Sequence, residues 1–155
     1  MDPSLESLVA RIRLILVDDS ADFARVAAKF LQGQDTLELV GVGTRAQDAF
    51  DLTAALAPDL VLLDLAMPGQ TGLEAIPGIK AARPGVKVVA LTLFDSSGYR
   101  HAAMAAGADG FVSKRSMAAD LIPAICASMG MAIPEAAGNT HVVPMAADTL
   151  EGDAP

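Results

Sequence analysis

Residues able to handle a phosphoryl group follow four short apolar segments of this chain. They are Asp18 and Asp19 after the first segment, Asp64 after the second, Thr92 after the third and Lys114 after the fourth. In an open parallel sheet, ligands bind in the crevice beyond the carboxyl ends of the strands, where residues far apart in sequence converge. If the segments are strands of such a sheet, the sequence predicts one pocket lined by three carboxylates, a hydroxyl and an amine.

Three carboxylates in one pocket predict a bound cation. Two carboxylates about 4 Å apart repel each other by about 4 kcal/mol at an effective dielectric constant of about 20. A cluster of Asp18, Asp19 and Asp64 therefore needs a counter-ion. An all-oxygen site with room for water and phosphate suits Mg²⁺ best, with Mn²⁺ as a substitute. The alternative is that Asp18 and Asp19 only cap the following helix, near the positive end of its dipole.

The other groups of the predicted pocket suit phosphoryl chemistry. A carboxylate such as Asp64, held at a strand end, can attack phosphorus once a metal neutralises its neighbours, and the product is an acyl phosphate. The Thr92 hydroxyl and the Lys114 ammonium can then contact the phosphoryl oxygens. Each also has an ordinary explanation, because threonine is common in strands and a lone lysine after a strand is usually solvated.

Strand-like segments alternate with segments of helical periodicity along the chain, which is typical of a parallel sheet with helices on both faces. The first helix is expected to begin at Ser20 and to end near Gly33. Its apolar stripe includes Phe23 and Val26. The predicted strands cover residues 14–17, 37–42, 60–63, 86–91 and 111–113.

Two of the later helices carry signals that bear on their bounds. Pro77 and Gly78 fall inside 73–82, so this helix is expected to be short, or to begin with Pro77 in its first turn. The last helix is expected to start at Ser116 and to place Ala118 on its buried face.

The composition bounds the domain organisation. A chain of 155 residues with 52% hydrophobic content is long enough for one domain with a proper core. That domain is expected over 12–130, after a polar lead over 1–11. Prolines and glycines break up the stretch over 131–155, which is expected to be a flexible tail without an output domain.

Charge and hydropathy exclude some partners at this level. The net charge is −8 and no cluster of Lys and Arg is present, so we expect no nucleic-acid surface. No apolar stretch approaches the roughly 18 residues of a membrane span. The first residues carry two acids and no basic region, unlike a signal peptide. We therefore expect a cytoplasmic protein without a membrane partner.

Taken in order, the acidic pair, the single acid, the threonine and the lysine resemble the response-regulator receiver domain of two-component signalling. The matching segments are 15–20, 62–69 with 72–73, 91–92 and 107–114, and the resemblance runs from about residue 13 to residue 129. It implies a flavodoxin-like five-stranded parallel sheet of order 2-1-3-4-5, with helices on both faces. The local sequence is most similar to receivers attached to a LuxR-type helix-turn-helix.

The resemblance also implies a role for each residue of the site. Asp64 would accept a phosphoryl group from a histidine kinase or a phosphotransfer protein. Mg²⁺ would be ligated by Asp19, Asp64 and the backbone carbonyl of Ala66, with Asp18 acting mainly through water. The switch pair would be Thr92, whose hydroxyl moves toward the phosphoryl group, and Phe111, whose ring then rotates inward. Lys114 would contact the phosphoryl oxygens.

The expected output follows from the same family. Phosphorylation would remodel the face made by the fourth helix, the fifth strand and the fifth helix, for a downstream protein or a second copy of the chain. Such a domain is not an enzyme beyond its own phosphorylation and dephosphorylation. Two alternatives are an aspartyl-nucleophile phosphatase and a receiver-like interaction module that is never phosphorylated. The phosphatases related to haloacid dehalogenases place an acid two residues after the nucleophile, and this chain has Ala66 there.

One departure from the family concerns the rim of the pocket. Receivers often carry a small residue after the switch threonine, where this chain has Leu93 followed by Phe94. We expect these side chains to crowd the phosphoryl site, to slow attack by water and to limit phosphorylation by small donors.

Overall fold

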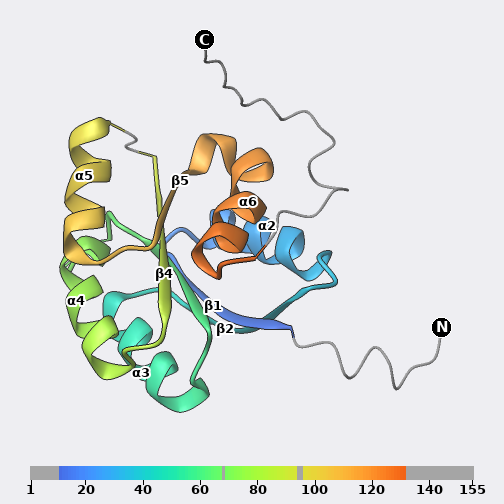
Figure 1. Cartoon of the computed structure of the whole chain (residues 1–155), viewed down its shortest axis with the longest axis horizontal. Helices are drawn as coiled ribbons and strands as arrows, with labels where there is room; N and C mark the ends of the chain where they lie inside the picture. Colours follow the sequence, from blue (N-terminus) through green and yellow to red (C-terminus); the bar gives the residue numbers. More distant parts are fainter. Residues whose placement is uncertain (1–10, 68, 94–95, 132–155) are drawn as a thin grey trace, which may run out of the picture.

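The computed structural model describes residues 11–67, 69–93 and 96–131. Strands and helices alternate along these residues (Figure 1). The strands are β1 (Ile12–Val17), β2 (Leu37–Gly43), β3 (Leu60–Asp64), β4 (Lys87–Thr92) and β5 (Gly110–Ser113). The helices are α2 (Ala21–Gln32), α3 (Ala46–Leu56), α4 (Gly72–Ala82), α5 (Ser97–Ala106) and α6 (Met117–Ser128). The predicted lead over 1–11 and the predicted tail over 131–155 lie outside the described residues, except for Arg11 and Met131.

The five strands form one parallel sheet of order β2-β1-β3-β4-β5. Helices α3, α4 and α5 lie on one side of this sheet, and α2 and α6 lie on the other (Figure 1). All four strands that bear predicted site residues therefore lie next to one another, with their carboxyl ends at one edge. The predicted flavodoxin-like architecture, strand order included, is confirmed.

Two apolar cores cover the two faces of the sheet. Alternate residues of the central strands point to opposite faces, so Leu14 and Leu62 pack with α2 and α6, whereas Ile15 and Leu63 pack with the other helices. Because both faces are covered, β1 and β3 are nearly continuous apolar runs and not alternating ones. The rigid centre of the molecule therefore ends directly at the aspartates that follow these two strands.

Helix α2 begins and ends where the sequence predicts. The Ser20 side chain accepts a hydrogen bond from the Phe23 N–H at 3.2 Å, and Gly33 closes the helix. The predicted apolar stripe is wrong at one position, because Val26 is 59% exposed and the smaller Ala24 is buried instead. The buried face of the helix thus consists of Ala24, Ala27 and Leu31.

Helix α4 differs from the prediction. It runs through Pro77 as a regular element from Gly72 to Ala82, and Pro77 is not in its first turn. A capping box begins the helix, with the Thr71 hydroxyl accepting the Glu74 N–H and the Glu74 carboxylate accepting the Thr71 N–H, both at 3.1 Å. Pro77 lies on the exposed side of the helix, where water can satisfy the carbonyl that its missing N–H releases.

Helix α6 begins directly after Ser116, its N-cap residue, as the sequence predicts. A short 3₁₀ turn, Lys114–Ser116, separates it from β5, and the helix begins at Met117. Met117 is buried and Ala118 is exposed, so the prediction of a buried Ala118 is wrong. The longer Met117 side chain reaches the core one turn before Leu121. Met117, and not Ala118, therefore begins the buried face of the helix.

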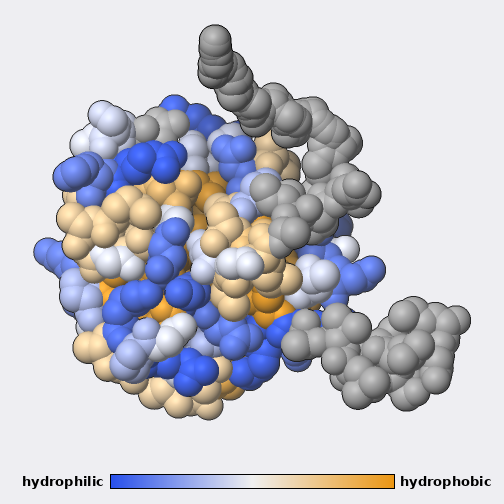
Figure 2. Space-filling view, in the orientation of Figure 1, coloured by the Kyte–Doolittle hydropathy of each residue, from blue (hydrophilic) through white to orange (hydrophobic). Residues whose placement is uncertain are grey.

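Polar and apolar side chains are both present on the outer surface of the molecule. Figure 2 shows blue hydrophilic residues separating the apolar areas on one face of the molecule. The larger exposed apolar side chains come from different elements: Val26, Val42, Leu93, Met104 and Met131. Among the described helices, none combines the length and the apolarity that a bilayer crossing requires.

Candidate functional site

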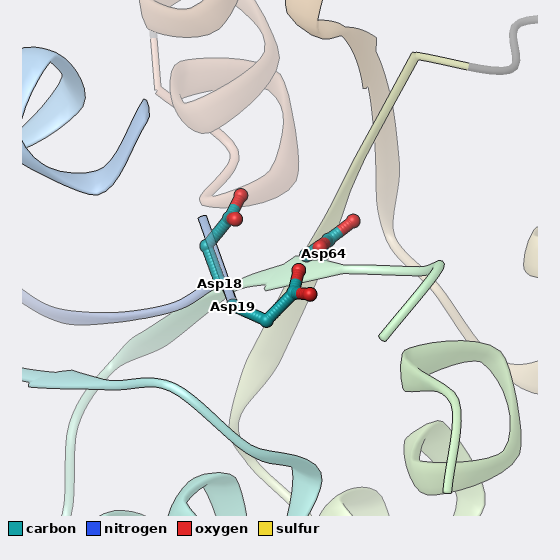
Figure 3. A group of neighbouring side chains, drawn as sticks. All are labelled: Asp18, Asp19 and Asp64. Carbon is teal, nitrogen blue, oxygen red and sulfur yellow. The ribbon is translucent and has the colours of Figure 1, made fainter. Parts of the chain in front are cut away.

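Three aspartates meet at the carboxyl ends of the two central strands. Asp18 and Asp19 directly follow β1, and Asp64 is the last residue of β3. The two strands are neighbours in a register that pairs Val17 with Leu63, so the aspartates begin side by side. One carboxylate oxygen of each lies within 4.8 Å of the others. Figure 3 shows the three side chains gathered at this edge, as the sequence predicts.

The three carboxylates differ in their contact with solvent. Asp18 is fully buried and Asp64 is 3% exposed, whereas Asp19 is exposed. A buried ionised carboxylate is costly unless it is paired or binds a cation. The cluster therefore has a buried floor, formed by Asp18 and Asp64, and one acid at its surface.

Lys114 supplies the cation that the described residues bring to this cluster. It begins the 3₁₀ turn after β5, and its side chain is 9% exposed. Its Nζ lies 2.6 Å from Asp18 Oδ2 and 3.6 Å from Asp64 Oδ1. One ammonium faces three carboxylates, so two negative charges remain uncompensated when all three acids are ionised.

Backbone N–H groups orient the two buried carboxylates. The Ser20 N–H donates to Asp18 Oδ1 at 2.8 Å, and the Ala66 N–H donates to Asp64 Oδ1 at 3.2 Å. Helix α2 is capped by the Ser20 side chain, so capping is not what Asp18 and Asp19 do here. Both buried side chains are instead held by the turns that follow their strands.

The pKa of Asp64 is raised from its ordinary value of 3.8 to about 6. Burial is the main cause, and the negative charge of Asp18 and a hydrogen bond with Asp19 act in the same direction. The Ala66 N–H and the Lys114 ammonium oppose the shift without cancelling it. The cluster thus resists full ionisation in the absence of a further cation.

The donor set fits a small hard divalent ion. Its atoms are carboxylate oxygens from three residues close enough to share one ion, and the surplus negative charge equals the charge of such an ion. Mg²⁺ prefers oxygen ligands, often one or two carboxylates with water filling the remaining positions. The exposed side at Asp19 leaves room for those waters.

Glycine at position 72 allows the site to be this compact. A Cβ atom at Gly72 would lie 1.9 Å from the Asp64 carbonyl oxygen and 2.9 Å from Leu65 Cα. Any side chain there would push the start of α4 away from the turn that carries Asp64. The sequence pattern contains Gly72, but the spacing alone does not reveal this contact.

The two predicted switch residues lie on neighbouring strands. Thr92 ends β4, is fully buried, and is paired in register with Ser113 of β5. Phe111 is 7% exposed and packs in the core on the α5 side of the sheet, with the Arg100 guanidinium carbon 4.6 Å from its ring centre. The Phe111 ring is therefore already inward in this structure.

Leu93 is the described residue of the pair predicted to crowd the rim of the phosphoryl site, and that crowding stays a prediction. It follows Thr92 directly, and half of its side chain is exposed. Phe94, its predicted companion in crowding the pocket, is outside the described residues. A second aromatic residue, Phe23, contacts Lys114, and the sequence pattern had placed it only in the apolar stripe of the first helix.

Comparisons with known proteins identify a set of bacterial regulators. DesR of Bacillus subtilis (strain 168), a transcriptional regulatory protein, is 36% identical over 114 residues, which cover 74% of this chain and 56% of DesR. The response regulator VraR of Staphylococcus epidermidis is 34% identical over 74% of this chain and 54% of VraR. The chain thus spans about half the length of the curated relatives it matches.

Solved structures agree with these sequence matches. A LuxR-family two-component response regulator from Aurantimonas sp. SI85-9A1 superposes with a TM-score of 0.74 at 29% identity, covering 81% of this chain and 92% of that one. A DNA-binding response regulator of the LuxR family from Staphylococcus aureus gives a TM-score of 0.69 at 26% identity, covering 76% of this chain and 98% of that one. The predicted likeness to LuxR-type receivers is confirmed.

The partner prediction is wrong where it leaves out nucleic acid and keeps only a protein target or a second copy. DesR and LnrK are named transcriptional regulatory proteins, and the similar Staphylococcus aureus structure is described as DNA-binding. The prediction used the net charge of −8 of this chain. That charge carries no information on the part of these longer relatives that the chain does not match.

The family assignment rests on the match over the whole folded unit. The family model of the response regulator receiver domain matches residues 14–126, which include every strand end that builds the aspartate cluster. This chain therefore belongs to the response-regulator receiver family of two-component systems.

Proposed function

We propose that this domain accepts a phosphoryl group on Asp64 from a phosphohistidine of a kinase or phosphotransfer protein, in a reaction that needs Mg²⁺. The observation that carries this proposal is the cluster itself: three carboxylates within reach of one ion, with Lys114 in contact with two of them. Asp64 is the member of the cluster that ends a fully buried strand and that contacts Lys114 at the longer distance, 3.6 Å.

The proposed reaction is a phosphoryl transfer between two side chains. An oxygen of the Asp64 carboxylate attacks phosphorus, an O–P bond forms, and the N–P bond of the donor breaks with its electron pair going to the imidazole nitrogen. The Lys114 ammonium then contacts a phosphoryl oxygen and offsets the charge that arrives. Thr92, buried beside the site, would donate a hydrogen bond to another phosphoryl oxygen.

The metal site in this proposal uses the oxygens nearest the strand ends. Asp19, Asp64 and the backbone carbonyl of Ala66 would hold the ion, and Asp18 would act through water. When bound, Mg²⁺ neutralises the acidic cluster and polarises the phosphoryl oxygens. The raised pKa of Asp64 supports this role, because burial and the negative charge of Asp18 disfavour the ionised carboxylate, and a bound cation would offset both effects.

The proposed output is a change in the surface formed by α5, β5 and α6. Thr92 ends β4, the strand between β3 with Asp64 and β5, and Phe111 belongs to β5 itself. Because similar proteins are named transcriptional and DNA-binding regulators, we infer that the signal ends in control of DNA binding. DNA binding would then be the role of another part of a longer protein, and this domain would control it through its phosphorylation.

Intact mass measurement tests the proposal directly. The wild-type protein is incubated with phosphoimidazole, or with a phosphorylated histidine kinase, in the presence of Mg²⁺. We expect the mass of one added phosphoryl group, which is absent with EDTA and absent in Asp64→Asn. The exposed Asp35→Asn, which lies outside the cluster, should label like the wild type. Equal labelling of wild type and Asp64→Asn would show that Asp64 is not the acceptor.

A further inference from the structure

The aromatic ring of Phe23 lies against the ammonium group of Lys114. The distance from Lys114 Nζ to the ring centre is 4.5 Å. A cation within about 6 Å of an aromatic face is attracted by the negative face of the ring, and the attraction grows when both groups are removed from water. The Lys114 side chain is 9% exposed and Phe23 is half-buried, so this contact is partly removed from water.

Four residues form a closed set of contacts around this pair. The Ser20 N–H donates to Asp18 Oδ1 at 2.8 Å, and the Ser20 hydroxyl accepts from the Phe23 N–H at 3.2 Å. The Phe23 ring then meets Lys114, whose Nζ returns to Asp18 Oδ2 at 2.6 Å. The first turn of α2 therefore fixes both an acid of the cluster and the ring beside the lysine.

The geometry gives the ring a task that a simple core residue would not have. A lysine side chain is long and flexible, and its ammonium is a point charge without the fixed fork of arginine. The carboxylates of Asp18 and Asp64 attract the Lys114 ammonium from one side. The Phe23 ring lies against it at 4.5 Å, so the ammonium is held where a phosphoryl oxygen on Asp64 would meet it.

We infer that Phe23 is a positioning residue for phosphoryl transfer, because its ring face holds the Lys114 ammonium beside Asp64. This inference rests on the proposed transfer of a phosphoryl group to Asp64. It assigns to the first helix a part in the chemistry, although Phe23 itself touches no reacting atom.

The test compares Phe23→Leu, which keeps an apolar side chain without a ring, with Phe23→Tyr, which keeps the ring. Phe30→Leu is the matched control, because Phe30 packs against the same core from the same helix, two turns away from the site. The first measurement is the rate of labelling by phosphoimidazole with Mg²⁺, followed by intact mass. The second is the NMR signal of the Lys114 ε-CH₂ group, which is tractable because the chain has only four lysines.

We expect Phe23→Leu to label about 3- to 10-fold more slowly than wild type, the change that loss of a partly desolvated cation–π contact produces. Phe23→Tyr should retain the wild-type rate, and Phe30→Leu should lose stability without losing rate. The Lys114 ε-CH₂ signal should be shifted upfield by the ring in wild type and Phe23→Tyr. In Phe23→Leu it should return to the range of the other lysines.

Three outcomes would overturn the inference. They are a wild-type rate in Phe23→Leu, equal slowing in Phe23→Leu and Phe23→Tyr, or a Lys114 signal that does not respond to removal of the ring. The proposed function fails separately, if Asp64→Asn is labelled as fast as wild type. If the wild type is labelled only on Asp64 and Phe23→Leu is labelled at the same rate, the proposed function stands but Phe23 has no role in it.

Discussion

Two lysine–aspartate pairs lie at opposite ends of the sheet, and their surroundings differ. At the amino ends of β4 and β5, Lys80 Nζ lies 2.7 Å from Asp109 Oδ2, and both side chains are 25% exposed. That carboxylate also accepts the Val88 N–H at 2.9 Å, and the ammonium donates to the Val86 carbonyl at 2.8 Å. The charges there are balanced one to one, and the polar contacts tie two strands to a helix.

The pair at the carboxyl ends has the same chemistry without the balance. Lys114 and Asp18 are as close, at 2.6 Å, but they are nearly inaccessible to solvent and two further carboxylates lie beside them. An ion pair by itself is therefore a poor marker of function. The uncompensated charge at the carboxyl ends is what separates a site able to bind a cation and a phosphoryl group from a structural bridge.

The largest difference between the pairs should appear when each lysine is removed. In the absence of metal, Lys114→Met is expected to lower the free energy of unfolding by about 3 kcal/mol, because it leaves buried carboxylates without a partner. Lys80→Met should cost about 1 kcal/mol or less, since that pair is partly exposed. Urea unfolding in EDTA measures both. Labelling of Asp64 should fall by about 100-fold in Lys114→Met only. Equal effects of the two substitutions would contradict the contrast.

A substitution at Gly72 should reach the carboxyl-end pair through the backbone. Gly72→Ala places a methyl group 1.9 Å from the Asp64 carbonyl oxygen, so the turn after β3 must shift. We expect a loss of about 2 kcal/mol in the free energy of unfolding and weaker Mg²⁺ binding, measured by urea unfolding and calorimetry. The control is Gly98→Ala in α5, where nothing lies within 4 Å of the added atom. That variant should be slightly stabilised. A tolerated Gly72→Ala would show that the turn is not tightly packed.

Removing the charge of Asp64 should stabilise the metal-free protein. The folded pKa of about 6 is above the ordinary 3.8, so the folded state holds this proton more tightly than the unfolded state does. The free energy of unfolding of the wild type therefore falls as pH rises through this window. Asp64→Asn avoids that loss and should be more stable than wild type by about 3 kcal/mol at pH 8, with little difference near pH 4.

Urea unfolding in EDTA at the two pH values measures this difference. At the other end of the sheet, Asp109→Asn removes a carboxylate that serves Lys80 and the Val88 N–H, so it should lower stability at pH 8. If Asp64→Asn were destabilising at pH 8, the cluster would not carry surplus negative charge. Added Mg²⁺ should reverse the order of wild type and Asp64→Asn, because it stabilises only a state that binds it.

The smallest effect is expected at the rim of the site. Leu93 is half exposed, so Leu93→Ala should change the free energy of unfolding by less than about 0.5 kcal/mol. If its side chain limits access of water to the phosphorylated aspartate, the lifetime of the phosphoryl group should shorten in this variant. Decay of the labelled mass with time measures this lifetime. An unchanged lifetime would show that Leu93 does not limit access of water to the phosphorylated aspartate. Met104→Ala, another half-exposed apolar residue, is the control.

Most of the fold and the gathering of the site could be predicted from the sequence. The central strands are apolar on both faces because helices cover both, and the parallel sheet then places their carboxyl ends at one edge. Asp18, Asp19, Asp64 and Lys114 come together for that reason alone. Such long-range convergence is predictable because it depends on topology and not on the detail of side-chain packing.

What the sequence could not predict depends on local competition between interactions. Pro77 was expected to limit α4, but the capping box at Thr71 and the exposure of Pro77 allow a regular helix. Met117 displaced Ala118 from the buried face because a longer side chain can reach the core from a neighbouring position. The contact of Phe23 with Lys114 joins a helix to a distant turn, and no spacing within one element reveals it.

The unequal exposure of the three aspartates has a consequence for how fast the site can fill. Asp19 faces solvent while Asp18 and Asp64 form the floor, so a hydrated ion can dock on Asp19 before it sheds water to reach the other two. The rate of metal binding should therefore be limited by dehydration of the ion, which Mg²⁺ undergoes reluctantly. Mn²⁺ or Ca²⁺ should bind faster than Mg²⁺ at equal concentration.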